Sequence, residues 1–115
     1  MYNVFVYGTL KKGNSNHHFL QNSEFLRDEV LEDHSIYVSN GFNFPLLLKD
    51  KGGKVHGEVY KVDDNTLATL DMLEGEGHLY NRIDNDTLGF QYYLFNEHNR
   101  WDNDRKKDKI NNGKW

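Results

Sequence analysis

The chain contains no cysteine among its 115 residues. This absence excludes disulfide bonds, a thiol nucleophile and zinc sites built on cysteine ligands, and it leaves the redox compartment open. The sequence also lacks an apolar run near the ~20 residues that a membrane helix needs. It begins directly on the apolar stretch Tyr2–Val6, without the basic leader segment of a signal peptide. We therefore expect neither secretion nor membrane insertion, and we expect a cytoplasmic location.

Positive charge is scarce as well, because 14 lysines and arginines stand against 18 aspartates and glutamates, which gives a net charge of −4. This balance argues against broad binding to phosphate backbones, so we expect no nucleic-acid partner. The basic run Arg105–Lys107 lies between Asp104 and Asp108, which is typical of a solvated tail. The length corresponds to one domain with one core, and aromatic residues, at 14% of the chain, are expected to fill much of it.

The spacing of the apolar residues predicts a mixed α+β domain over residues 1–115, with five or six strands and two short helices. Strands are expected at 2–7, at 24–38 as one strand or two, at 54–62, at 80–84 and at 90–95. An extended apolar segment at 42–48 is expected to lead into a turn at 50–53. A short helix is expected after Asn14 or Ser15, and a second helix from Asp63 or Asp64 to Gly75 and Gly77. From about residue 97 the chain is expected to be a polar tail.

The junction Tyr7-Gly8-Thr9-Leu10 is the first candidate for chemistry, because a buried strand runs into a loop there. A glycine-containing turn leaves backbone N–H groups without partners in the sheet, and such groups bind carboxylates or oxyanions. The alternative interpretation is a tight turn whose amides face water.

The second candidate is Glu74, at the end of the longer predicted helix. Leu70 and Leu73 are expected to face the core, and Glu74 flanks their apolar stripe. Partial burial and the negative end of the helix dipole would both raise the pKa of its carboxyl, toward the range useful for acid–base catalysis. The alternative is a solvated surface glutamate, which is the usual place for this residue type.

Strand alternation places Tyr80 and Arg82 on one face, shortly after Glu74 in the chain. They are expected either to hold an anionic ligand or orient Glu74, or simply to pack across the sheet. The neighbours His17 and His18 would point about 100° apart on a helix and would not chelate one metal ion. The HExxH arrangement is absent too, so no metal site is expected.

Taken together, these segments resemble the γ-glutamylcyclotransferase-like proteins, and most closely their γ-glutamylamine cyclotransferase branch. The matching blocks follow the family's order within residues 2–95: Val4–Gly13 with Asn16, His17 and Leu20; Phe44–Leu46; Gly57–Val62; Leu70–Gly75; and Leu79–Arg82. No family motif matches Glu76–His78, the loop Asn85–Gly89 or the tail after Asn96. Because these regions surround the expected pocket or fall outside the pattern, the leaving group of the substrate stays open.

The resemblance implies a small mixed barrel-like sheet flanked by short helices. It implies a reaction in which the α-amine of a γ-glutamyl substrate attacks its own γ-carbonyl and releases 5-oxoproline and a free amine. In this role Glu74 is the general base and then the general acid. The residues implied to bind the substrate are Tyr7, Gly8, Thr9, Leu10 and Tyr80. The family reaction needs no cofactor, and none is expected here.

Three alternatives stay open at the level of the sequence. The first is a γ-glutamyl peptide as substrate in place of a γ-glutamylamine. The second is a non-catalytic protein on the same fold that binds a small γ-glutamyl or carboxylate metabolite. The third is a protein-interaction module that uses the tail, with Trp101 and Trp115 as anchors. The oligomeric state cannot be read from the sequence.

Overall fold

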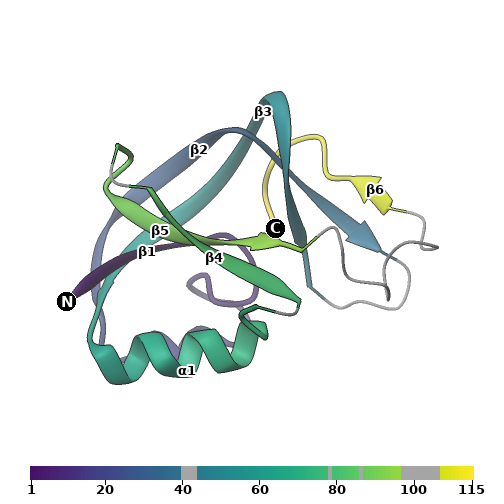
Figure 1. The fold of residues 1–115 in the computed structure, drawn as a ribbon. Helices are drawn as coiled ribbons and strands as arrows, with labels where there is room; N and C mark the ends of the chain where they lie inside the picture. Colours follow the sequence, from purple (N-terminus) through teal and green to yellow (C-terminus); the bar gives the residue numbers. More distant parts are fainter. Residues whose placement is uncertain (40–43, 78, 86, 97–106) are drawn as a thin grey trace.

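The computed structural model describes residues 1–39, 44–77, 79–85, 87–96 and 107–115 (Figure 1). The elements of this part are, in chain order, β1 (Tyr2–Val6), the 3-10 helix η1 (His17–Leu20), β2 (Glu24–Ser39), β3 (Leu46–Val62), α1 (Asp64–Glu74), β4 (Tyr80–Asn85), β5 (Phe90–Phe95) and β6 (Lys107–Lys109). The strands form one sheet in the order β4-β5-β1-β3-β2-β6. The pair β1–β5 is parallel and the other pairs are antiparallel. The predicted α+β class with a mixed sheet is therefore confirmed.

Strand β1 lies in the middle of the sheet and is buried on both faces, as its run of β-branched and aromatic residues predicts. Val4 and Val6 point to a core shared with α1, and Phe5 points to a second core on the opposite face. The helix-side core comprises Val4, Val6, Leu10, Leu20, Leu46, Tyr60, Val62, Leu67, Leu70, Tyr80, Tyr93 and Phe95. The far-side core comprises Phe5, Tyr7, Leu31, Ile36, Leu47, Val55, Val59, Phe90 and Tyr92. In Figure 1, α1 runs beneath β1, β4 and β5.

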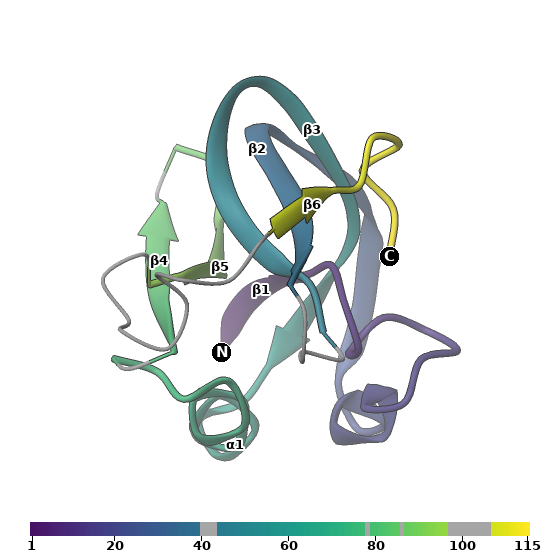
Figure 2. The same cartoon turned by 90° about the vertical axis from the view of Figure 1, so that its right-hand side faces the viewer.

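Strands β2 and β3 form a long antiparallel pair that arches away from α1 (Figure 2). The predicted turn at 50–53 does not divide β3, so the expectation of two separate segments was wrong. Pairing with β2 continues on both sides of this point, with partners Glu32↔Lys54 and His34↔Lys49. The turn signal reflects an irregularity in the ladder, where Gly52 has φ +84° and its N–H donates to the Asp33 carboxylate at 3.0 Å.

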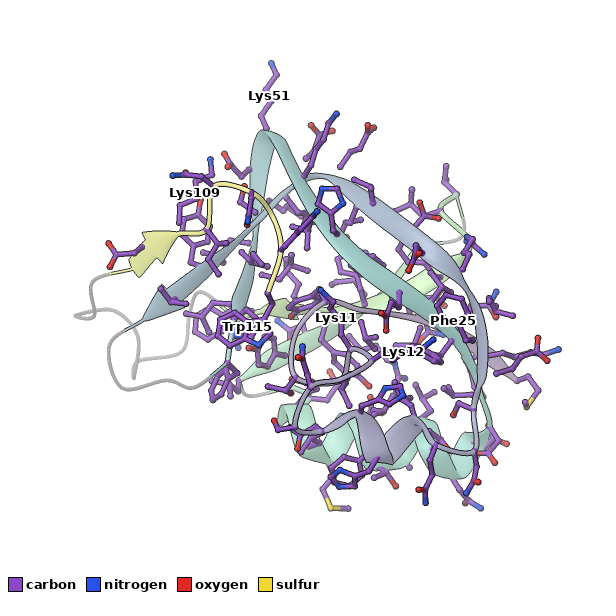
Figure 3. The ribbon with its side chains drawn as sticks, turned by 180° about the vertical axis from the view of Figure 1, so that it is seen from behind. Lys11, Lys12, Phe25, Lys51, Lys109 and Trp115 are labelled. Atoms are coloured by element: carbon purple, nitrogen blue, oxygen red, sulfur yellow. The ribbon has the colours of Figure 1, made fainter. Side chains whose placement is uncertain are left out.

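The last described segment, 107–115, also departs from the prediction, because it is not a solvated tail. Strand β6 pairs with β2, and the Ile110 N–H donates to the Ile36 carbonyl at 2.9 Å. Ile110 and Trp115 pack against the far-side core, and the Lys11 Nζ donates to the Trp115 carbonyl at 3.4 Å (Figure 3). Trp115 is thus partly buried against its own domain rather than free as an anchor. Trp101 and the basic residues Arg105 and Lys106 lie outside the described residues.

Helix α1 follows the predicted signals closely at both ends. The Asp63 carboxylate accepts from the Thr66 N–H at 2.7 Å as N-cap, and Gly75 ends the helix in the left-handed conformation with φ +62°. Its buried residues are Leu67 and Leu70. The expectation for Leu73 was wrong, since this side chain is 39% exposed. In the described part of the chain, helices fall short of the length and apolarity required to span a membrane.

Candidate active site

A small pocket opens where β1 ends, between this strand, the last turn of α1 and the start of β4. We call it the inner pocket. It is lined by Phe5, Val6, Tyr7, Gly8, Thr9, Leu10, Phe44, Pro45, Glu74, Tyr80 and Tyr93. The structure therefore brings Glu74 together around one pocket with the five residues implied to bind the substrate, although these residues come from segments far apart in the chain.

The loop after β1 is held by hydrogen bonds to its carbonyl groups. The Asn14 side-chain amide donates to the Gly8 carbonyl at 2.9 Å, and the Asn16 N–H donates to the Thr9 carbonyl at 2.8 Å. The His17 Nδ1 lies 3.0 Å from the Leu10 carbonyl. In contrast, the N–H groups of Gly8, Thr9 and Leu10 meet no acceptor within the described part of the chain. The loop thus keeps backbone donors unused at the pocket wall, which is the property expected of an anion-binding turn.

Gly8 is required for the shape of this wall. A Cβ atom at Gly8 would lie 2.7 Å from Pro45 Cγ and 2.9 Å from Pro45 Cδ, well inside van der Waals contact. Pro45 is fixed in turn by Tyr80, whose hydroxyl donates to the Pro45 carbonyl at 2.6 Å. The absence of a side chain at Gly8 therefore lets the pocket wall close, whether or not a substrate is bound.

Glu74 is the last residue of α1 and is partly buried in the pocket wall. Burial raises the pKa of its carboxyl from 4.5 to about 7. Among the described residues, no hydrogen bond or ion pair satisfies this carboxyl. The carbonyl of the next residue, Gly75, accepts from the N–H groups of Leu79 at 2.9 Å and Tyr80 at 3.5 Å. This tight return of the chain carries Tyr80 to the same pocket as Glu74.

Two buried tyrosines, Tyr7 just after β1 and Tyr93 of β5, line the inner pocket together with Glu74. The Tyr7 hydroxyl donates to the Tyr93 carbonyl at 2.6 Å. Burial, with smaller contributions from Tyr80 and Glu74, raises the Tyr7 pKa well above its usual value, so this hydroxyl stays protonated. The Tyr93 hydroxyl donates to the Asp71 carboxylate at 2.7 Å, and its pKa is raised by burial and by that bond. Both rings are therefore held as neutral hydrogen-bond donors.

Arg82 is not placed to bind a ligand in the inner pocket or to orient Glu74. Its guanidinium forms an ion pair with Asp71, one turn before Glu74 on α1. It does not line the inner pocket. Tyr80 and Arg82 do share one face of β4, as the alternation predicted, but the Tyr80 hydroxyl donates to the Pro45 carbonyl whereas Arg82 pairs with Asp71.

Phe44, Pro45 and Tyr93 line the pocket and were not named as site residues from the sequence. Phe44 and Pro45 stand in a block that resembles the family, so a signal for them was present. Nothing in the local pattern of β5 distinguishes Tyr93 from its neighbours, since both Tyr92 and Tyr93 are buried. Within the described ranges, no group of three or more histidine, aspartate or glutamate side chains is arranged to hold a metal ion.

The chain matches the family model described as "Gamma-glutamyl cyclotransferase, AIG2-like" over residues 4–115. It is 43% identical over 88 residues to gamma-glutamylaminecyclotransferase A of Danio rerio, which covers 70% of this chain and 55% of the fish protein. A putative gamma-glutamylcyclotransferase of Drosophila melanogaster is 41% identical over 87 residues, which cover 69% of this chain and again 55% of the relative. The chain thus spans about half the length of these two relatives.

One solved structure illustrates the likeness in three dimensions. An AIG2-like protein from Mus musculus superposes with a TM-score of 0.73 at 28% identity, and the match covers 88% of this chain and 81% of the mouse chain. On the family model, the identities and the fold, the chain belongs to the AIG2-like γ-glutamyl cyclotransferase family.

Proposed function

We propose that this protein is an enzyme that converts a γ-glutamylamine into 5-oxoproline and a free amine, with Glu74 as the proton carrier. The observation that carries the proposal is the state of Glu74, a partly buried carboxyl with a pKa of about 7 and no partner among the described residues. A carboxyl in this state takes up and returns protons readily near neutral pH. The resemblance to the γ-glutamylamine branch, and the name of the Danio rerio relative, favour an amine over a peptide as the leaving group.

The reaction has two proton problems that one carboxyl solves in turn. The α-ammonium of the substrate, with a pKa of roughly 8, loses a proton to Glu74 and becomes nucleophilic. Its nitrogen then attacks the γ-carbonyl carbon, which closes a five-membered ring. As the bond between this carbon and the amide nitrogen breaks, Glu74 returns the proton to the leaving nitrogen. The attacking nitrogen still holds one proton more than the ring nitrogen of 5-oxoproline, and Glu74 takes up this proton and passes it to the released amine, which leaves as an ammonium ion. Atoms and charge balance without a further reactant, so the chemistry itself calls for no cofactor.

The loop Gly8–Leu10 supplies the second part of the mechanism. Its unused N–H groups are suited to bind the α-carboxylate of the substrate and the negative charge that develops on the γ-carbonyl oxygen. Because these donors are fixed by the hydrogen bonds on the loop's carbonyl side, they need no rearrangement when the charge appears. Tyr80 lines the same pocket and would contact the glutamyl moiety beside Glu74.

The narrow inner pocket suits a substrate that must fold back on itself. Attack by a tethered amine requires the chain to adopt a ring-like pose, and holding that pose contributes several kcal/mol, roughly 7–11 in the best model reactions. Aromatic and proline side chains from two segments, Tyr93 of β5 and the neighbours Phe44 and Pro45, surround this space. The protein thus needs to supply shape and a proton carrier, but no nucleophile of its own.

The test is direct detection of 5-oxoproline by mass spectrometry after incubation with a panel of γ-glutamylamines and γ-glutamyl dipeptides. We expect product with the unmodified protein and a fall in rate of roughly 10²- to 10⁴-fold for Glu74→Gln. Glu76→Gln is the matched control, because Glu76 is exposed and lies outside the pocket. Near-normal product release by Glu74→Gln would overturn the mechanism. A ligand that raises the unfolding temperature without being consumed would favour a binding protein instead.

A further inference from the structure

The loop at residues 8–13 is closed mainly on itself. The carbonyl groups that bond within it are met by residues 14–17, which follow directly in the chain. Such local bonds set the shape of the loop, but they do not fix its position against the sheet. Within the described part of the chain, two hydrogen bonds join the loop to segments beyond residue 17. The shorter runs from the Lys12 N–H to Glu58 Oε1 at 2.9 Å.

The other hydrogen bond, from Lys11 Nζ to the Trp115 carbonyl at 3.4 Å, begins on a long and flexible side chain. It therefore restrains the main chain of the loop less than a bond made by a backbone N–H. The contact with Glu58 holds the main chain itself. Apart from the buried Leu10 side chain, this carboxylate is the direct connection between the backbone of the loop and the middle of the sheet.

Glu58 is itself held in place for this contact. It lies on β3 opposite Val6, the last residue of β1, and so stands beside the point where the loop leaves the sheet. The same Oε1 atom accepts from the Tyr60 hydroxyl at 2.9 Å. Hydrogen bonds to an ionised acceptor are stronger than bonds between neutral groups. One carboxylate oxygen thus joins β3 to the main chain at Lys12.

The Tyr60 ring supports the loop at a second point. Tyr60 is 2% exposed, and its ring centroid lies 5.7 Å from that of His17, whose Nδ1 is 3.0 Å from the Leu10 carbonyl. The Phe25 ring packs edge-on against Tyr60 at 5.5 Å. The Lys12 ammonium lies 4.6 Å from the centre of the Phe25 ring, and the two side chains are neighbours in Figure 3. These contacts hold the loop at both Leu10 and Lys12.

From this arrangement we infer that Glu58 is a positioning residue, which holds the loop Gly8–Leu10 in the place where its N–H groups can bind the substrate. The inference rests on the proposed function, because it concerns the donors that bind the α-carboxylate and the developing oxyanion. Glu58 does not line the inner pocket, so it acts through the backbone of Lys12 rather than on the substrate. Donors of this kind depend on being fixed before the charge appears.

The experiment measures kcat and KM separately for the γ-glutamylamine that the unmodified protein converts fastest. In Glu58→Ala the loop loses its connection to β3, so we expect KM to rise and kcat to fall, with kcat/KM lower by roughly 10- to 100-fold. Glu58→Gln keeps an acceptor oxygen for both donors and should recover most of this loss. Asp28→Ala is the matched control, because Asp28 is an exposed carboxylate paired with Glu58 across the ladder of β2 and β3. It should change kcat/KM less than about twofold.

Two further readouts separate positioning from a general loss of structure. A smaller folded fraction would lower the apparent kcat and leave KM unchanged, so the rise in KM is specific to the loop. The pH at which kcat/KM is half-maximal should stay the same in Glu58→Ala, since Glu74 keeps its surroundings. Amide exchange measured by NMR reports the contact without turnover: the Lys12 N–H should exchange faster in Glu58→Ala than in the unmodified protein and in Glu58→Gln.

The outcomes separate the inference from the proposed function. Normal KM and kcat in Glu58→Ala, while the unmodified protein turns over, would overturn the inference and leave the function standing. A fall in kcat alone that follows a lower unfolding temperature would do the same. Equal losses in Glu58→Gln and Glu58→Ala would assign the effect to the charge of Glu58 and also overturn it. If the unmodified protein converted no γ-glutamylamine, the proposed function would fail, and Lys12 exchange would then decide whether Glu58 fixes the loop of a binding protein.

Discussion

Two carboxylates on α1, Asp71 and Glu74, lie one turn apart and have opposite surroundings. Asp71 is satisfied on both oxygens, by the Arg82 guanidinium and by the Tyr93 hydroxyl. Glu74 has no such partner among the described residues, and burial holds its pKa near 7. The same helix end thus carries a carboxylate that joins α1 to the sheet and a carboxyl that is left available to the pocket.

This difference shows that one carboxylate of α1 stabilises the fold while the other remains available for chemistry. The Asp71 contacts fix the last turn of α1 against β4 and β5, since Arg82 and Tyr93 belong to these strands. Because that anchor is independent of Glu74, the neighbouring carboxyl can remain unpaired without loosening the helix. A buried, unpaired carboxyl costs stability when it ionises, and such sites mark positions where a protonation equilibrium is used.

The largest effect on stability is expected from Glu74→Gln, which removes a carboxyl whose ionised form is disfavoured by burial. The folded-state pKa of about 7 exceeds the reference value of 4.5, so the folded protein holds this proton where the unfolded chain releases it. Stability therefore falls as pH rises from about 4.5 to 7. Glu74→Gln should be more stable than the unmodified protein by about 2–3 kcal/mol above pH 7, and equal to it near pH 4. Urea unfolding at a series of pH values measures the difference.

Glu76→Gln again provides the control, because Glu76 is exposed and its substitution should leave the pH dependence in place. A stability difference between Glu74→Gln and the unmodified protein that stays constant from pH 4 to 8 would contradict the prediction. It would mean that Glu74 titrates alike in the folded and unfolded states. The activity and the stability of Glu74→Gln are thus expected to change in opposite directions.

The next effect comes from removing the cationic partner of Asp71. Arg82→Ala removes the cation from an ion pair whose side chains are 29% and 27% exposed, so we expect a loss of about 1–2 kcal/mol in the free energy of unfolding. Arg82→Lys keeps the charge and should recover part of the loss. Thermal and urea unfolding measure both variants. A loss below about 0.5 kcal/mol for Arg82→Ala would show that the pair contributes little and that α1 is anchored by its leucines alone.

The helix and its two ends could be predicted from the sequence, because capping residues and apolar spacing are local signals. Asp63 and Gly75 mark the observed ends, and Leu67 and Leu70 are buried as their spacing requires. Leu73 was assigned to the core by the same periodicity, and there the local rule failed. At Leu73 the helix meets a surface cleft instead of the sheet, and periodicity does not report what a helix face meets.

Backbone pairing explains the other differences. Strand β6, Lys107–Lys109, is made of polar residues, but without it β2 would be an edge strand, and an edge strand offers backbone donors and acceptors to any segment of suitable geometry. The continuity of β3 through residues 50–53 likewise depends on its partner strand. The candidate site follows the same logic: Glu74 and the loop Gly8–Leu10 carried motifs, whereas Tyr93 enters the pocket only through the register of β5 beside β1.

The smallest expected effect concerns Tyr93, which contacts Asp71 and also lines the pocket that contains Glu74. Its ring lines the inner pocket and its hydroxyl donates to Asp71 at 2.7 Å. Tyr93→Phe removes this one bond and keeps the ring, so we expect a loss of about 1 kcal/mol in stability and less than a tenfold change in kcat/KM. If Tyr93→Phe lowered kcat/KM a hundredfold at unchanged stability, the hydroxyl would act in the chemistry. The assignment of Asp71 and its partners to stability alone, and of Glu74 to chemistry, would then be wrong.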